Sequence, residues 1–140
     1  MLSVIVVDTS VTLAWVLDEA EDRQRYAASV VNAKLDGEVL IAPQLMMQEA
    51  AHKLLKQGRR EKWGEAKTAE YGETIDFFGV RLLDVTSTVA AHIRFCIRWN
   101  VQGFDAVFLA LAMSTGAKIA TLDGGLRTAA KSAGVELFTG

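Results

Sequence analysis

Four acidic residues stand apart from the other charged side chains because each lies next to a strongly apolar segment. They are Asp8, Glu49, Asp105 and Asp123. Most of the remaining acids lie in mixed-charge stretches such as 19–25 and 59–65, which is typical of a solvated surface. Two carboxylates about 4 Å apart repel each other by about 4 kcal/mol at an effective dielectric of about 20. A pocket in which the four converge is therefore expected to recruit a cation.

Asp8 and Asp123 each follow a short apolar run that is typical of a buried strand. These runs are residues 3–7 and 118–121. Taken alone, either acid is equally well explained as a helix N-cap or as part of a turn. The pair is more informative, because open α/β sheets bind ligands beyond the carboxyl ends of their strands, where the strand order reverses. If the two strands are neighbours, the two carboxylates lie about 5 Å apart, one strand spacing.

Asp105 lies in the first turn of the most apolar predicted helix, residues 104–115. An acid at this position stabilises the helix dipole, and that is the simpler explanation. However, a helix that is apolar nearly all round is expected to lie deep in the fold. A buried carboxylate needs a partner to offset its desolvation, and no basic residue is adjacent in the sequence. We therefore treat Asp105 as a candidate metal ligand.

Glu49 stands among small and apolar residues, one turn into a helix that we expect to begin after Pro43. The alternative is an exposed acid on a polar stripe with Gln48, His52 and Lys53. Glu49 and His52 also match the Glu-x-x-His motif of di-iron bundles, but those proteins need two such motifs on a helical bundle and this chain has one. We exclude iron and group Glu49 with the other three carboxylates.

The scarcity of other ligand types restricts the metal. With one cysteine, Cys96, and two histidines, the chain has no set able to hold zinc and no internal disulfide. Carboxylates completed by water and substrate phosphate suit Mg²⁺ or Mn²⁺ better than a caged Ca²⁺. Such ions promote phosphodiester cleavage because they activate water, neutralise the phosphate and stabilise the leaving oxygen. The candidate chemistry is metal-dependent hydrolysis.

Short apolar runs alternate with helical stretches, and this alternation predicts how the acids are positioned. It is typical of a parallel α/β sheet covered on both faces, and 140 residues fit a single domain, residues 1–140. We expect strands at 3–7, 39–41, 80–83, 118–121 and 135–138. We expect helices at 10–17, 22–35, 44–56, 61–77, 87–98, 104–115 and 125–133.

Residues that favour helix ends support these boundaries. Pro43 suits a first helical turn, and Ser87 suits an N-cap. Gly58 and Gly116 suit the ends of helices. We expect each of the four to mark a helix boundary.

The charge and the opening residues restrict the partners and the compartment. The net charge of −2 argues against non-specific coating of nucleic acid, which needs many cationic contacts to phosphates. No segment approaches the roughly 18 uncharged apolar residues that span a bilayer. Residues 1–8 lack the basic leader of a signal peptide. We therefore expect a cytoplasmic protein with no membrane partner.

A basic stretch follows Glu49 on the same predicted helix and continues across Gly58. Lysines and arginines in such a stretch can guide an RNA backbone by contacting its phosphates. The simpler explanation is an ordinary solvated helix end. The candidate RNA-binding residues are Lys53, Lys56, Arg59 and Arg60, with Lys62 beside them.

The chain resembles the PIN-domain proteins, and specifically the VapC-type toxins of bacterial and archaeal toxin–antitoxin pairs. The resemblance rests on four segments that occur in order and at family-like spacing. They are VVDTSV, APQLMMQEAAHKLL, GFDAVFLALA and IATLDGGLRTAAKSAGV. Each segment alone is an acid in a common local context, but together they extend over essentially the whole chain.

The resemblance implies a three-layer α/β/α fold with about seven helices and a five-stranded parallel sheet in the order 3-2-1-4-5. It implies an endoribonuclease that uses Mg²⁺ or Mn²⁺ and forms a homodimer or a larger hetero-oligomer with a cognate antitoxin, whose tail plugs the pocket. The family's four acids correspond to Asp8, Glu49, Asp105 and Asp123, and Ser10 and Thr121 match polar positions that support the pocket.

Three other functions are open from the sequence. Two keep the PIN fold, as a nuclease of RNA processing outside a toxin–antitoxin system or as a protein that binds without cutting. The third is a phosphoacceptor signalling domain, in which Asp84 after the third strand would accept the phosphoryl group. Such domains have an acidic pair after the first strand, whereas this chain has Asp8 and Thr9. That alternative also leaves Glu49 and Asp105 unexplained.

Overall fold

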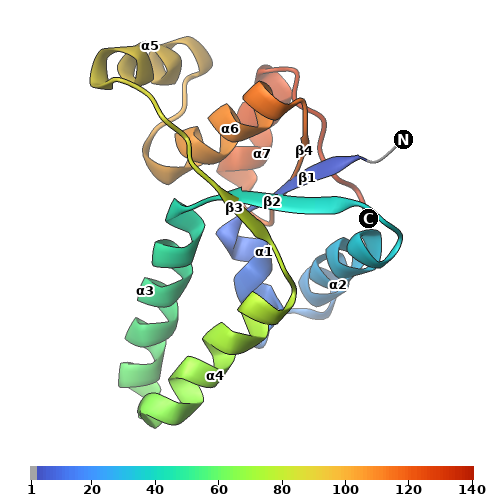
Figure 1. The fold of residues 1–140 in the computed structure, drawn as a ribbon, viewed down its shortest axis with the longest axis vertical. Coiled ribbons are helices and arrows are strands. Elements are labelled where there is room, and N and C mark those ends of the chain that lie inside the picture. The colour runs from blue at the N-terminus through green and yellow to red at the C-terminus, as the bar shows by residue number, and fades with distance from the viewer. Residues whose placement is uncertain (1–2) are drawn as a thin grey trace.

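The computed structural model describes residues 3–140. Met1 and Leu2, the first residues of the segment that we expect not to be a signal peptide, lie outside the described residues. Strands and helices alternate along the chain (Figure 1). In chain order they are β1 (Val4–Val7), α1 (Thr9–Ala14), α2 (Glu21–Leu35), β2 (Val39–Pro43), α3 (Leu45–Glu61), α4 (Gly64–Phe77), β3 (Arg81–Leu83), α5 (Val89–Trp99), α6 (Gly103–Thr115), β4 (Lys118–Ala120) and α7 (Gly124–Ser132). Each of the seven helices in residues 3–140 overlaps one predicted helix, although α3 continues to Glu61, five residues past its predicted end, and α4 begins at Gly64 instead of 61.

The strands form one parallel sheet in the order β3-β2-β1-β4. In the middle of β1, Val6 pairs with Ile41 of β2 on one side and with Ile119 of β4 on the other. The predicted adjacency of the first and fourth strands is therefore confirmed. Because β1 and β4 are parallel neighbours, the residues that follow them meet at one edge of the sheet.

The predicted fifth strand, 135–138, is reduced to a single parallel bridge between Leu137 and Ile119. It lies beside β4, as the predicted order requires. Two hydrogen bonds hold it, from Ile119 N to Glu136 O at 3.0 Å and from Phe138 N to Ile119 O at 2.8 Å. Both bonds involve Ile119 in the middle of the three-residue strand β4, and the pairing does not extend to further residues. Within residues 3–140 the sheet therefore has four strands.

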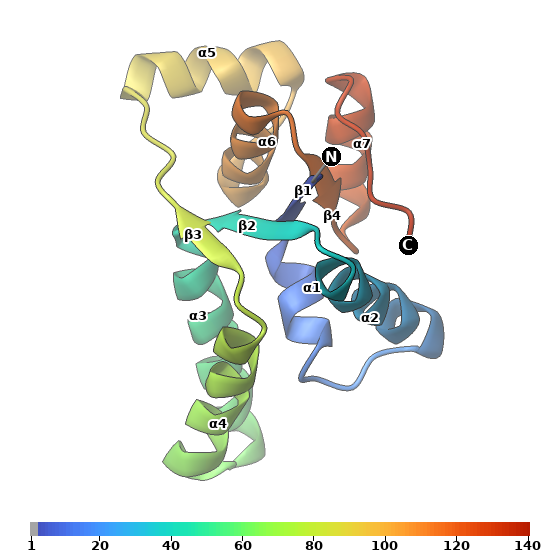
Figure 2. The same cartoon turned by 45° about the vertical axis from the view of Figure 1, so that its right-hand side comes forward.

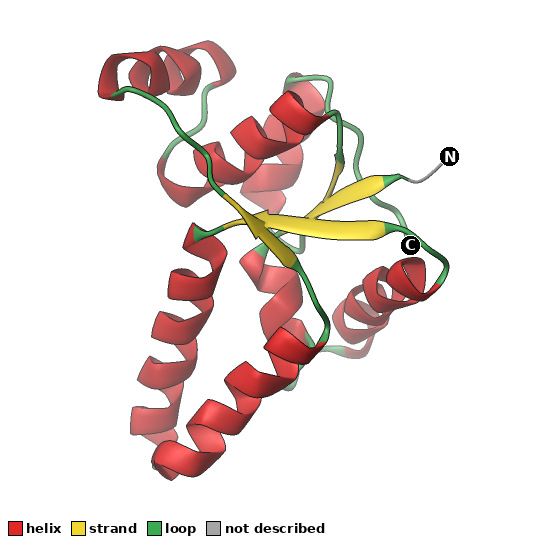
Figure 3. Cartoon of the chain, viewed as in Figure 1, coloured by secondary structure: helices red, strands yellow, loops and turns green. Residues whose placement is uncertain are grey.

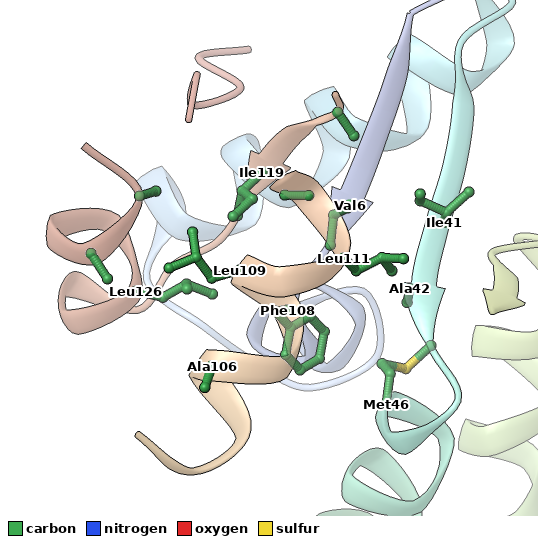
Figure 4. Packing of buried hydrophobic residues seen from close by; sticks show 14 of the residues in the cluster. Val6, Ile41, Ala42, Met46, Ala106, Phe108, Leu109, Leu111, Ile119 and Leu126 are labelled. Carbon is green, nitrogen blue, oxygen red and sulfur yellow. The ribbon is translucent and has the colours of Figure 1, made fainter. Parts of the chain in front are cut away.

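Helices cover both faces of the sheet, which gives three layers (Figure 3). The side chains of β1 alternate, so Ile5 and Val7 pack in the cluster with α1 and α2, and Val6 packs in the opposite cluster. That second cluster is centred on α6, whose Phe108 and Leu109 are fully buried against Val6 and its neighbours (Figure 4). The prediction that 104–115 lies deep in the fold is confirmed.

Three of the four predicted helix-boundary residues serve other roles. Pro43 is the last residue of β2, and α3 begins two residues later. Ser87 is not the N-cap of α5; Thr88 is, because its side chain accepts a hydrogen bond from Ala91 N. Gly58 lies inside α3, whereas Gly116 does end α6, with a positive φ of 69°.

Position 58, inside α3, requires a glycine because α3 packs closely against α4 there. A Cβ on Gly58 would lie 2.6 Å from Thr68 Oγ1 and 3.2 Å from the ring of Trp63. Thr68 Oγ1 is fixed by donating to Gly64 O at 2.7 Å. The two helices thus form a hairpin that extends away from the sheet in both views (Figures 1 and 2). No helix in residues 3–140 has the length and apolar character needed to cross a lipid bilayer.

We predict that Gly58→Ala destabilises the protein although alanine favours helices. The added methyl overpacks the hairpin at a cost of about 1–3 kcal/mol, against a helix-propensity gain of at most about 1 kcal/mol. The control is Gly72→Ala in α4, where an added Cβ meets nothing within 4 Å, so stability should rise by about 0.5–1 kcal/mol. Denaturant unfolding measures both. Equal stabilisation by the two substitutions would contradict this account of the helix packing.

Candidate active site

Asp8 follows β1 directly and occupies the N-cap position of α1, with extended backbone angles. Its side chain makes no capping hydrogen bond, so the simple N-cap explanation does not account for it. Its backbone N–H donates to Ala120 O at 2.9 Å, which continues the pairing of β1 with β4. Only 6% of the residue is exposed. Asp8 is thus a nearly buried acid whose carboxylate has another role.

Two hydroxyl groups hold the Asp8 carboxylate. Ser10 Oγ donates to Asp8 Oδ2 at 2.6 Å, and Thr121 Oγ1 donates to the same oxygen at 2.8 Å. Each hydroxyl also accepts a backbone N–H from the turn after β4, Ser10 from Leu122 at 3.0 Å and Thr121 from Asp123 at 2.9 Å. Because each hydroxyl bonds both the Asp8 carboxylate and the backbone of this turn, the two hydroxyls set the position of Asp8 relative to Asp123.

Asp123 and Asp105 approach one another across Gly125. Asp123 is the N-cap of α7 and its Oδ1 accepts from Gly125 N at 3.0 Å, so this acid does fulfil the capping role. Asp105 lies in the first turn of α6. A Cβ built on Gly125 would lie 3.5 Å from Asp123 Oδ1 and 3.8 Å from Asp105 Oδ2. Both carboxylates therefore border one small space, into which Gly125 places no side chain.

Burial and the other three acids together raise the pKa of Asp105. Its pKa is raised from 3.8 to about 6, first by burial and then by the negative charges of Asp123 and Asp8. A hydrogen bond with the Asp123 carboxylate and the charge of Glu49 raise this pKa further. The ion pairs found in residues 3–140 leave all four acids without a basic partner. The site is a concentration of uncompensated negative charge.

Glu49 lies one turn into α3, half-buried between Gln48, which is exposed, and Ala50, which is buried in the core. Its charge makes the smallest contribution to the shifted pKa of Asp105. The polar-stripe alternative requires an exposed acid, whereas Glu49 is half-buried and its charge acts on Asp105. Glu49 therefore belongs to the rim of the site.

The oxygen donors fit a hard divalent cation that keeps part of its water shell. Among residues 3–140, no three His, Cys, Asp or Glu side chains lie close enough together to hold a metal ion directly. Mg²⁺ dehydrates reluctantly and is commonly bound through one or two carboxylates plus waters. The open space at Gly125 and the uncompensated charge on Asp105 suit an ion of that kind.

The basic residues of α3 extend from beside Glu49 towards the far end of the helix. Lys53 is one turn beyond Glu49, and Arg59 and Arg60 lie ten or more residues along the same helix, about 15 Å further on. The side chains of Lys53, Lys56, Arg59 and Arg60 are all exposed. The structure therefore places these candidates on the outside of the hairpin, where a solvated helix also explains them.

Arg127 is a residue near the site that the sequence analysis missed. Its Nε donates to Thr121 O at 2.9 Å, although Arg127 lies in the first turns of α7. The spacing in the sequence could have identified it. Residues four apart on a helix lie on one face, so Arg127 lies on the same face as Asp123, the N-cap of α7.

Asp84 lies at the edge of the sheet opposite to β4. It follows β3, an edge strand that β2 separates from β1, and its side chain is exposed. It is not among the charges that act on Asp105.

Comparisons with known proteins agree with this arrangement. The chain resembles the structure of PAE2754 from Pyrobaculum aerophilum, with a TM-score of 0.62 and 18% identity over 91% of this chain and 84% of that chain. It also resembles the structure of VapBC2 from Rickettsia felis bound to a DNA fragment from their promoter, with a TM-score of 0.64 and 9% identity over 96% of this chain and 97% of that chain. At these identities the likeness concerns the fold.

A comparison with curated proteins finds no match. The family model of the PIN domain matches residues 5–132, a range that contains all four candidate acids and both supporting hydroxyls. The chain therefore belongs to the PIN domain family.

Proposed function

We propose that this protein is a Mg²⁺- or Mn²⁺-dependent endoribonuclease that acts as the toxin of a toxin–antitoxin pair. PIN domains are nucleases, so membership of the family supports hydrolysis of phosphodiester bonds. The observation that supports the metal requirement is the geometry of three acids: Asp8 is nearly buried and held by two hydroxyls, and Asp105 and Asp123 border the space at Gly125. The raised pKa of Asp105, caused by burial and the neighbouring carboxylates, agrees with this. The likeness to a VapBC2 structure supports the toxin role.

The four acids would have two parts in the proposed hydrolysis. Asp8, Asp105 and Asp123 would hold the cation, not all directly but in part through bound water, with Ser10 and Thr121 orienting Asp8. When bound, the cation would supply positive charge that stabilises the phosphate and would lower the pKa of water. Glu49, on the rim, orients or deprotonates the attacking water. In-line attack then leaves a 5′-phosphate and a 3′-hydroxyl.

The partners and the cellular context belong to the same proposal. Residues 1–140 form a single PIN domain that acts in the cytoplasm, as a homodimer or in a larger hetero-oligomer with a cognate antitoxin. RNA is the substrate, and Lys53, Lys56, Arg59 and Arg60 are its candidate contacts outside the pocket. A PIN nuclease of RNA processing is the alternative, and a neighbouring gene for a small DNA-binding protein with a disordered tail would favour the toxin.

A phosphoacceptor domain built on Asp84 is poorly supported. Such a domain needs its acceptor near the acid that follows the first strand, but β2 lies between the two strands concerned. Asp84 is exposed and does not influence Asp105. Labelling of Asp84 by acetyl phosphate would favour that function, and metal-dependent cleavage of RNA would exclude it.

We predict that Asp8→Asn lowers RNA cleavage by orders of magnitude while the protein still folds. The amide keeps the shape of the carboxylate and can still accept from Ser10 and Thr121, but it removes the negative charge that binds the cation. Cleavage of a labelled RNA in Mg²⁺ or Mn²⁺ measures activity, and circular dichroism measures folding.

The matched control is Asp84→Asn, the same substitution after another strand of the sheet. It should cleave RNA at the wild-type rate. Retained activity in Asp8→Asn, or an equal loss in both variants, would refute the assignment of Asp8.

We predict that Mn²⁺ binding strengthens as the pH rises through about 6, because a proton on Asp105 competes with the cation. Below that pH the affinity should fall about tenfold per pH unit, and it should level off about one unit above the pKa. Calorimetric titration with Mn²⁺ between pH 5 and about 7.5 measures this. Asp105→Asn should bind more weakly and with a flatter pH profile. A flat wild-type profile would contradict the role of Asp105.

A further inference from the structure

The turn between β4 and α7 is held by three consecutive carbonyl groups, each of which accepts a hydrogen bond. Thr121 O accepts from Arg127 Nε at 2.9 Å, and Leu122 O accepts from an Nη atom of Arg23 at 3.4 Å. Asp123 O accepts from the backbone N–H of Arg127 at 3.0 Å. Arg127 therefore binds both ends of the turn, once through its main chain and once through its side chain.

The Arg127 side chain is itself fixed. Its guanidinium lies over the ring of Tyr26 in α2, with Cζ 5.2 Å from the ring centroid. Tyr26 is half-buried and its hydroxyl donates to Phe138 O at 2.7 Å. The ring of Tyr26 also packs edge-on against that of Phe138, with centroids 6.0 Å apart. Since α2 and the C-terminal segment both hold Tyr26, the guanidinium has a rigid surface to lie on.

We infer that Arg127 is a positioning residue that sets the geometry of the carboxylate site through Thr121. This inference rests on the proposed metal-binding function. Thr121 uses its hydroxyl twice, donating to Asp8 Oδ2 at 2.8 Å and accepting from Asp123 N at 2.9 Å. Its backbone carbonyl is the group that Arg127 binds. Fixing that peptide fixes the hydroxyl, and with it the relative positions of the two acids.

The hydrogen bond and the charge of Arg127 can be separated by substitution. In glutamine the side-chain nitrogen is as many bonds from Cα as Nε is in arginine, so Arg127→Gln keeps a donor there without the charge. In lysine a methylene occupies that place, so Arg127→Lys keeps the charge without the donor. Arg127→Leu removes both.

The experiment is calorimetric titration of the full chain with Mn²⁺ in the absence of RNA. Arg127→Leu and Arg127→Lys should weaken binding about tenfold, the lower end of the effect of groups that orient metal ligands. Arg127→Gln should bind nearly as tightly as the wild type. The charge control is Arg25→Gln on α2. The Arg25 side chain pairs with Glu21 at the exposed surface, so this substitution should leave binding unchanged.

Other results would contradict the inference in distinguishable ways. Wild-type affinity in Arg127→Lys, or a loss in Arg127→Gln equal to that in Arg127→Leu, would overturn positioning through the hydrogen bond. Unchanged affinity in all three variants would show that Arg127 has no part in the site. If the wild type itself bound no Mn²⁺, the proposed metal function would fail before Arg127 was tested. Because Arg127→Lys and Arg127→Gln differ at the donor, a folding defect in Arg127→Leu alone leaves the test intact.

Discussion

The pairing of β1 with β4 is the constraint on which the site depends. These strands are distant in sequence, and their parallel register brings the residues after Val7 and Ala120 to the same edge of the sheet. The hydrogen bond from Asp8 N to Ala120 O carries this pairing one residue beyond the strand. From there Thr121 reaches Asp8 with its side chain, so strand pairing passes directly into the hydrogen-bond network of the site.

Bringing the acids together has a cost for the metal-free fold. The pKa of Asp105 is raised from 3.8 to about 6, so folding favours its protonated form. This contribution to stability is fully present below the unfolded pKa of 3.8 and is lost as the pH rises through about 6. The buried packing of α6, which includes Phe108 and Leu109, holds the helix in place despite the burial of this carboxylate and its repulsion by the neighbouring acids. A cation bound at the proposed site would offset it at neutral pH.

The sequence predicts the fold and the adjacency of β1 and β4 well, because both follow from the order and spacing of apolar runs along the chain. Runs of β-branched residues before Asp8 and the apolar helix after Asp105 predict strand, helix and burial. Helix ends are less predictable. Proline and glycine are favoured at helix ends, but in this protein Pro43 ends a strand and Gly58 lies inside a helix. The neighbour that decides Gly58 is Thr68 on the next helix, which no local rule can identify.

The side-chain network around Asp8 could not be derived from patterns, because it joins hydroxyls and carbonyls from three separate segments. The family resemblance points to Ser10 and Thr121. Arg127 is indicated in the sequence only by its spacing of four residues from Asp123, and Tyr26 by no local feature. Their roles arise only when α2 is packed beside the turn after β4. The candidate carboxylates can therefore be identified from their neighbours in the sequence. The groups that position these carboxylates can be identified only from the packing of distant segments. Variation between related sites is for this reason expected in the supporting residues before it reaches the acids.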